Sequence, residues 1–181
     1  MAATIEADYY NGVGPTRASA EAGFKFNRED TISGTTPIPI PTATGTNFSY
    51  HKAFALYCSA GGGSTSLLNR KIYTNGAPSD ANAKLWWTLF ATDTYSQATA
   101  VASADSGADN STPATGTYGQ AWAAVPTTSG TATTWDAATV AATNTTKNGK
   151  YLVVCCGVAS IFAAGAGSFA LPDFKFQYDE Q

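Results

Sequence analysis

Charge and histidine are scarce in this chain of 181 residues. Asp, Glu, Lys and Arg make up 13% of it, against about 25% in ordinary globular domains, and there is one histidine, His51. Neutral polar residues must therefore cover much of the surface. Ten Lys and Arg stand against thirteen Asp and Glu, and the basic residues form no cluster. Because such a surface cannot neutralise a phosphate backbone, we expect no nucleic-acid partner.

Catalytic and cofactor motifs are missing as well. The chain contains no G-x-S-x-G, G-x-x-x-x-G-K-[ST] or H-E-x-x-H pattern, which are the patterns of serine hydrolases, phosphate-binding loops and zinc proteases. Five carboxylates fall in expected loops or strand ends, and we interpret them as solvated surface groups rather than an acid/base pair. They are Asp93, Asp105, Asp109, Asp136 and Asp173. We expect no enzymatic activity and no cofactor.

Cysteines number three, Cys58, Cys155 and Cys156. An odd count in a reducing compartment predicts no disulfide framework. Cys155 and Cys156 are neighbours in an expected strand, so their side chains point to opposite faces and cannot easily share a metal ion. His51 and Cys58 would lie about 23 Å apart on an extended strand, which excludes a nucleophilic pair. We expect three small, buried side chains and no metal site.

Two segments bear on localisation. Residues 1–10 have neither a basic start nor an apolar run, so we expect no secretory signal peptide. We therefore expect the chain to be made in a cytosol. Residues 151–172 contain no charge and are long enough for a membrane helix. Their β-branched first half, their Gly- and Ala-rich centre and Pro172 favour strand, turn and strand instead. We therefore expect no membrane partner.

Hydrophobic alternation with a period of two predicts several β-strands. Residues 48–58 are expected to form one half-buried strand, with Phe48, Tyr50, Phe54, Leu56 and Cys58 on a single face. Strands are also expected at 67–73, 84–92, 151–160 and 173–178, with turns at Asn75-Gly76 and Asn148-Gly149. In the last strand Phe174, Phe176 and Tyr178 face inward, and Asp173, Lys175 and Gln177 face outward.

No segment shows a sustained helical period, so the expected fold class is all-β. Seven to ten strands over residues 48–181 would form a β-sandwich or a jelly-roll-like domain. The strand at 84–92 is apolar on both faces. Such a strand is central in a sandwich or has one face covered by a partner, and the first alternative is favoured.

Residues 1–47 differ in composition and are expected to form an extended N-terminal arm. Their alternating Pro37, Ile38, Pro39, Ile40 and Pro41 favour an extended path, because each proline fixes its own φ and restricts its predecessor. Fully extended, the arm could reach on the order of 150 Å and cross onto a neighbouring subunit. The alternative, equally favoured, is an arm that folds back along its own domain as edge strands.

Tryptophans complete the candidate interface residues. We assign to a candidate interface the residues 37–41 together with Trp86, Trp122 and Trp135. An exposed Trp122 or Trp135 could instead stack on a sugar, as in a receptor-binding module, although tryptophan more often fills a core or an interface.

Three stretches of the sequence resemble small virion proteins of tailed phages. They are FNREDT at 26–31, GTTPIPIPTATGTNFSY at 34–50 and LPDFKFQYDE at 171–180, with a shorter likeness at 95–99. In that group an FSY segment opens the sandwich and an F-x-F-x-Y-D-E strand closes the chain. The paired cysteines at 155–156 and the double tryptophan at 86–87 are not part of this pattern.

This resemblance implies a virion structural protein and no catalytic residues. Cyanophage and related capsids carry β-sandwich cement proteins, often trimeric, over their lattice. The implied role is a capsid cement or decoration protein on the capsid exterior, made in the host cytoplasm, with the major capsid protein as its partner and a homotrimer as its oligomer. The alternatives are a structural protein of the neck or tail and a carbohydrate-binding module of the virion.

Overall fold

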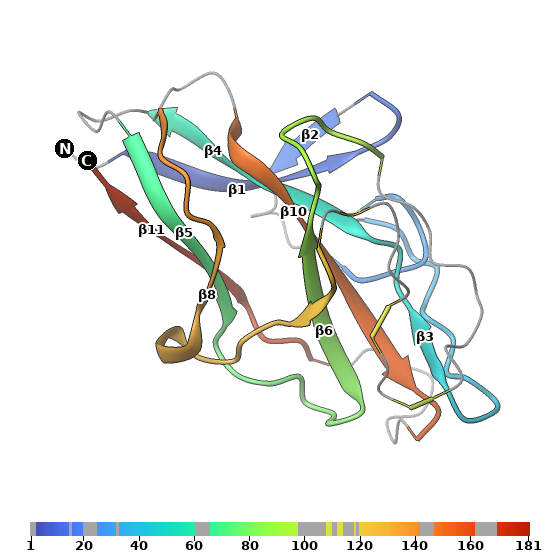
Figure 1. Cartoon of the computed structure of the whole chain (residues 1–181). Coiled ribbons are helices and arrows are strands. Elements are labelled where there is room, and N and C mark those ends of the chain that lie inside the picture. Colours follow the sequence, from blue (N-terminus) through green and yellow to red (C-terminus); the bar gives the residue numbers. More distant parts are fainter. Residues whose placement is uncertain are drawn as a thin grey trace.

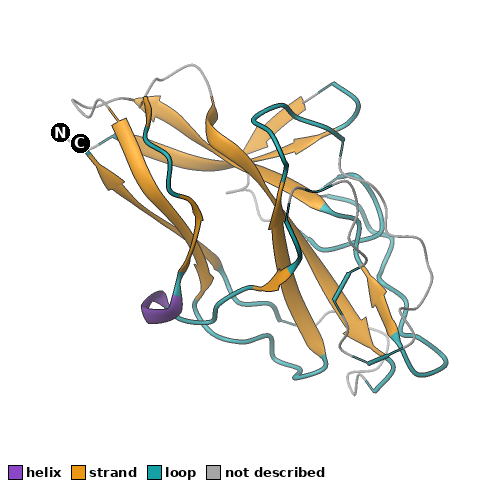
Figure 2. Cartoon of the chain, viewed as in Figure 1, coloured by secondary structure: helices purple, strands orange, loops and turns teal. Residues whose placement is uncertain are grey.

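Two antiparallel β-sheets make up the computed structural model of this chain (Figures 1 and 2). The structure describes residues 3–14, 16–19, 25–31, 33–60, 66–97, 108–109, 112–113, 118, 120–141, 147–161 and 170–181. These residues form eleven strands and one short 3-10 turn, η2 (Ser129–Thr131). The all-β sandwich expected from the two-residue period is confirmed.

The larger sheet, sheet A, has the strand order β2-β1-β4-β10-β6-β7, and β3 also pairs with β10. Its strands are β1 (Thr4–Asn11), β2 (Thr16–Ser19), β3 (Thr46–Phe48), β4 (Lys52–Ala60), β6 (Ala83–Leu89), β7 (Ala123–Ala124) and β10 (Lys147–Ala159). The long strand β10 lies in its middle, between β4 and β6 (Figure 1). This central place explains why the uncharged run from Tyr151 to Ala159 is buried throughout.

The smaller sheet, sheet B, has the order β11-β5-β8, and β9 also pairs with β5. Its strands are β5 (Ser66–Thr74), β8 (Thr133–Asp136), β9 (Val140–Ala141) and β11 (Phe174–Glu180). Side chains of β11 alternate between half-buried and exposed, with Phe174, Phe176 and Tyr178 packed against the core. The expected orientation of this last strand is confirmed.

The main core, which we call the inter-sheet core, lies between the facing sides of the two sheets. Every second residue of β10 belongs to it, from Leu152 to Val158, because successive side chains of a strand point to opposite faces. Sheet B contributes Ile72 and Trp135. The buried residues of this core are mostly aliphatic.

A second cluster, which we call the outer layer, covers the other face of sheet A. The alternate residues of β10, Tyr151, Val153 and Cys155, form its floor. Its upper part is largely aromatic and comes in part from segments outside the strands; its members are Tyr10, Phe48, Trp86, Phe90, Tyr95, Tyr118 and Trp122. Sheet A is therefore buried on both faces within one chain, which accounts for the two apolar faces of residues 84–92.

The segment expected as an arm contributes strands to sheet A. β1 lies between β2 and β4 and pairs with β4 from Thr4 to Tyr10. The expected boundary at residue 47 falls inside β3. The described part of residues 1–47 follows the folded-back alternative, and β1 is an interior strand rather than an edge strand.

The prediction of a single strand at 48–58 is wrong in one respect. The strand is interrupted, because β3 ends at Phe48 and β4 begins at Lys52. At this break Ser49 N donates to Cys156 O (2.8 Å), and Cys156 N donates to Ser49 Oγ (3.0 Å). The break changes the alternation, so Phe48 lies in the outer layer whereas Phe54 and Leu56 lie in the inter-sheet core. Alternation alone had placed the three side chains on one face.

The turn expected at Asn148-Gly149 is also wrong, because both residues lie inside β10. The pairing of β10 with β4 shifts register between Asn148 and Leu152, and Gly149 has a φ of +81°. A glycine with positive φ in a strand is the usual mark of a bulge. The turn at Asn75-Gly76, in contrast, follows β5 as expected.

The uncharged run at 151–172 starts as the expected strand, β10. Among the residues that the structure describes, no helix has both the length and the apolar character needed to cross a membrane. The sequence also predicts a flexible turn at the glycine-rich residues 61–64, a short strand near 100–103 and a turn at 163–168, and these residues lie outside the described ones.

Candidate functional site

Residues 37–41, which we call the proline strap, lie on the surface of the sandwich. Ile38 and Ile40 are half-buried and pack against the inter-sheet core, whereas Pro37 and Pro39 are exposed and Pro41 is intermediate. The alternation of proline and isoleucine thus separates an anchored side of the strap from a side that faces outward.

Hydrogen bonds hold the strap at the residue that precedes it and at its middle. Arg28 N donates to Thr36 O (3.0 Å), and Thr36 N donates to a carboxylate oxygen of Glu29 (2.9 Å). Asn47 Nδ2 donates to Pro39 O (2.9 Å). The exposed prolines therefore project from a segment with fixed geometry.

The three tryptophans assigned to an interface do not share one cluster, because Trp135 lies apart from the other two. Trp86 is half-buried and Trp122 is 7% exposed, and both belong to the outer layer. Trp135, on β8, is 3% exposed and belongs to the inter-sheet core. In this chain neither Trp122 nor Trp135 presents an open ring face on which a sugar could stack.

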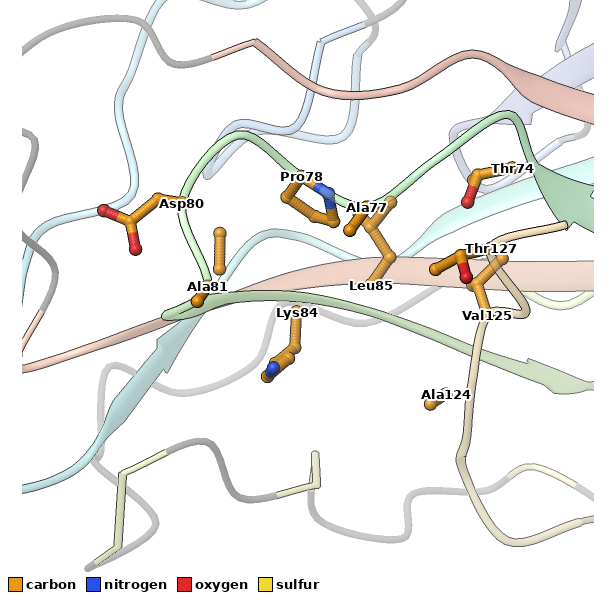
Figure 3. A pocket seen from close by; sticks show the side chains of 11 residues that line it. Thr74, Ala77, Pro78, Asp80, Ala81, Lys84, Leu85, Ala124, Val125 and Thr127 are labelled. Carbon is orange, nitrogen blue, oxygen red and sulfur yellow. The ribbon is translucent and has the colours of Figure 1, made fainter.

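A small pocket of about 200 Å³ lies where the β5–β6 connection meets β6 (Figure 3). Its lining residues are Thr74, Ala77, Pro78, Asp80, Ala81, Ala83, Lys84, Leu85, Ala124, Val125 and Thr127. Figure 3 shows the charged ends of Asp80 and Lys84 directed to different sides. Thr74 Oγ1 lies 2.7 Å from Gly76 O, and Asp80 accepts a hydrogen bond from Asn82 N (2.8 Å). Thr74 and Asp80 thus bond to the local backbone, and the charged ends of Asp80 and Lys84 do not converge on a ligand position.

Lys52 occupies a polar cage built by residues 27–31. Its side chain is 0% exposed, and Nζ donates to Asn27 Oδ1 (2.9 Å), Thr31 O (2.8 Å) and Glu29 O. Burial lowers the pKa of Lys52 to about 8, although the nearby Asp30 and Glu29 carboxylates favour its charged form. The cage fastens the segment before the proline strap to β4.

Asp30 ties this same segment to β1 and to the loop after β6. It accepts hydrogen bonds from Tyr9 Oη (3.2 Å), Gly12 N (2.9 Å) and Gln97 Nε2 (2.7 Å). Burial, followed by the charge of Asp30, raises the pKa of Tyr9 well above its ordinary value. These contacts indicate a structural role for the carboxylate.

Arg70 and Asp136 form a buried ion pair that joins β5 to β8, with Nη2 and Oδ2 2.6 Å apart. Burial alone would raise the pKa of Asp136, but hydrogen bonds from Ala138 N, Lys150 N and Arg70 outweigh it and hold that pKa below its ordinary value. Gly149 lies against the pair. A Cβ there would come within 2.6 Å of both Arg70 Nη2 and Asp136 Oδ2.

His51 is 4% exposed and belongs to the rim of the outer layer. Its Nδ1 lies 2.7 Å from Tyr118 Oη, and its ring centroid lies 4.8 Å from that of Trp122. Burial lowers the pKa of His51 to about 4, so the ring is neutral at pH 7. Cys58, Cys155 and Cys156 are buried, as expected.

Of the five carboxylates proposed as solvated groups, the four that the structure describes do not pair with one another. Asp93 and Asp173 are exposed, and Asp105 lies outside the described residues. Asp109 accepts hydrogen bonds from Gly45 N (3.1 Å) and from Ser160 N (2.9 Å) and Oγ. Asp136 differs from the expectation, because it is buried against Arg70. No group of three or more His, Cys, Asp or Glu residues is placed to hold a metal ion in the described part of the chain.

Sequence reasoning missed the Lys52 cage and the Arg70–Asp136 pair. A weak signal existed for each, since both cations occur inside apolar strands where a charge needs a partner. The partners come from distant segments, which local periodicity does not identify. Comparisons of the chain with models of known protein families, with curated proteins and with solved structures gave no match.

Proposed function

We propose that this chain is a structural protein of a tailed-phage virion, and that it decorates the outside of the capsid by binding the major capsid protein. Three features support the proposal: a compact β-sandwich, a surface with few charges, and the likeness of residues 26–50 and 171–180 to small virion proteins. A decoration protein acts through surface contacts and needs no reactive centre.

The observation that carries the proposal is the proline strap. Pro37 and Pro39 face outward, while Ile38 and Ile40 fix the strap to the core. A segment already held in its extended form loses little conformational entropy when it binds, so more of the contact energy appears as affinity. On a capsid the contact is repeated over many sites of one lattice, where even small interfaces suffice to keep the shell covered.

Substitution of the exposed prolines tests this role. The double variant Pro37→Asp/Pro39→Asp places two charges on the expected contact and leaves both isoleucines in place. The control variant Ser129→Asp/Thr134→Asp adds the same charge at exposed positions of η2 and β8. Binding to purified capsids stripped of this protein should weaken by about tenfold or more in the first variant and remain unchanged in the second.

Equal binding by both variants would overturn the role of the strap. Deletion of residues 1–46 is a poorer test, because it removes β1 from the interior of sheet A. Copy number in purified virions separates capsid from neck and tail: hundreds of copies support decoration, about a dozen indicate the neck or tail alternative, and absence from the particle contradicts both.

A further inference from the structure

The outer edge of β11 is the longest strand edge that the structure leaves without a partner strand. β11 has seven residues and pairs with β5 alone among the described strands. The other strands at the ends of the two sheets are shorter: β2 and β8 have four residues each, and β7 has two. β11 also contains no proline, a residue that commonly protects an edge from pairing.

Backbone hydrogen bonds show which peptide groups of β11 point away from β5. Asn75 N donates to Asp173 O, and Gln181 exchanges hydrogen bonds with Ser66 in both directions. The pair shifts register between Gln177 and Asp179, where β5 carries one additional residue, but the bonds on either side of the shift, at Asp173 and Gln181, both involve odd-numbered residues. Because such bonds alternate along a strand, the odd-numbered residues of β11 bond to β5. The N–H and C=O groups of Phe176 and Tyr178 therefore point toward the open edge.

This edge is complementary to itself. In an antiparallel pair centred on Gln177, Lys175 of each copy lies opposite Asp179 of the other, and Phe176 lies opposite Tyr178. Opposite charges and aromatic pairs across strands are both stabilising. The free groups of Phe176 and Tyr178 then form roughly four backbone hydrogen bonds between the copies.

Neighbouring registers lack this match. Centring the pair on Phe176 sets Asp173 against Asp179, two like charges, and centring it on Tyr178 sets Phe176 against Glu180. Registers shifted by an odd number of residues are excluded, because they would place core-facing residues of one copy opposite solvent-facing residues of the other. The sequence of β11 thus selects the register around Gln177.

We propose that a second copy of this chain binds at the β11 edge, so that the two β11 strands pair about a twofold axis and join the two B sheets into one. Such an interface uses the same surface on both copies and closes on two. The proposal does not depend on the virion role. It differs from the trimer implied by the resemblance, because a twofold pair alone yields a dimer.

Charge exchange tests the register. Lys175→Glu and Asp179→Lys each convert both charge pairs of the dimer to like charges, so either variant alone should dimerise about tenfold or more weakly. An equimolar mixture of the two restores opposite charges at both pairs and should form a heterodimer. Lys84→Glu, at an exposed position of β6, makes the same change in net charge as Lys175→Glu and should behave like the wild type.

Analytical ultracentrifugation of the full chain distinguishes the outcomes, because one copy has a mass of 18.7 kDa. A wild-type dimer that is lost in each single variant and regained in their mixture supports the proposal. A wild-type monomer at millimolar concentration, a trimer, or a dimer indifferent to the charge exchange overturns it. Circular dichroism of each variant confirms that the sandwich is folded.

A disulfide provides the second measurement. Gln177 would face its own copy across the axis at a pair without hydrogen bonds, where Cα atoms lie about 4.5 Å apart, a distance that a disulfide can span. Gln177→Cys should therefore form a covalent dimer under mild oxidation, whereas Lys84→Cys should not. The three native cysteines are buried and do not interfere. Equal or absent crosslinking in the two variants would contradict the twofold pairing.

Discussion

The two faces of sheet A are covered in different ways. On the inner face, residues such as Leu152 and Val154 of β10 pack against a second sheet, and regular strands supply both sides of the contact. On the outer face, Val153 and Cys155 of the same strand lie beneath aromatic rings, several of which come from connecting segments. One strand therefore contributes adjacent residues to two cores with different kinds of cover.

The chemistry of the covering side chains follows from this difference. Connecting segments have backbone N–H and C=O groups that do not pair with a neighbouring strand. Aromatic side chains with a polar atom, such as tyrosine, can fill apolar space and also form hydrogen bonds with these groups. Tyr95 Oη donates to Gly12 O (3.0 Å), and His51 Nδ1 lies 2.7 Å from Tyr118 Oη. Close packing of strands stabilises the inner core, whereas the outer layer also depends on polar contacts at the edges of its rings.

The largest expected difference in stability between the two faces concerns two glycines of β10. Gly149 lies next to the Arg70–Asp136 pair, and Gly157 lies against Phe48 of the outer layer. Gly149 has a φ of +81°, and an added Cβ would meet the buried charges of Arg70 and Asp136 at 2.6 Å. Gly157 has no positive φ, and its added Cβ would meet the side chains of Phe48 and Thr46 at 2.9 to 3.0 Å. Gly149→Ala should lower the free energy of unfolding by about 3–5 kcal/mol, and Gly157→Ala by about 1–3 kcal/mol.

Urea unfolding followed by tryptophan fluorescence measures both variants against the wild type. Gly130, which lies in η2 with open space around it, supplies the control: Gly130→Ala should change stability by less than about 0.5 kcal/mol. If Gly157→Ala lowered the free energy of unfolding more than Gly149→Ala, the outer layer would be the more rigid face, and the expected difference between the faces would be wrong.

Local alternation predicted the strands that are regular over their whole length. It predicted the inward side chains of β11, because this strand keeps one phase from end to end. It also located β5, although the buried positions of β5 change phase at a register shift, from Leu67 to Arg70, Ile72 and Thr74. It failed where the phase changes: at Ser49, whose hydroxyl bonds to the backbone of Cys156, and at the bulge of Gly149. Both irregularities depend on contacts with distant residues, which a two-residue period does not contain.

The polar sites were harder to predict than the strands. Lys52 meets residues 27–31, and Arg70 meets Asp136, which are partners far apart in sequence. The burial of Trp122 and Trp135 depends likewise on which segment covers which face. The proline strap was identifiable from its own residues, because proline restricts backbone geometry locally. Whether it binds a capsid stays a prediction.

Protonation of His51 provides a second way to weaken the outer layer selectively. Its pKa is about 4 in the folded chain, against 6.5 for an ordinary histidine, because burial disfavours the charged ring. The unfolded chain therefore binds the proton first as the pH falls. The stabilising contribution is complete above pH 6.5 and declines as the pH falls toward 4, by a total on the order of 3 kcal/mol.

Comparison with His51→Asn isolates this effect from the titration of carboxylates. The variant has no titratable ring, so the difference in unfolding free energy between wild type and variant should shrink as the pH falls from 7 to 4. Urea titrations at several pH values measure it. A difference that stays constant over this range would mean that His51 accepts a proton in the folded chain as easily as in the unfolded one.

The smallest effect comes from one pair of adjacent valines with opposite surroundings. Val154→Ala removes two methyl groups from the inter-sheet core, and Val153→Ala removes the same groups from beneath the outer layer. Both side chains are at most 1% exposed, so lost burial is nearly equal. We expect a loss of about 2–3 kcal/mol at Val154 and about 1–2 kcal/mol at Val153, because connecting segments relax into a cavity more readily than paired strands. Equal losses in urea unfolding would show that the outer layer packs as tightly as the inner core.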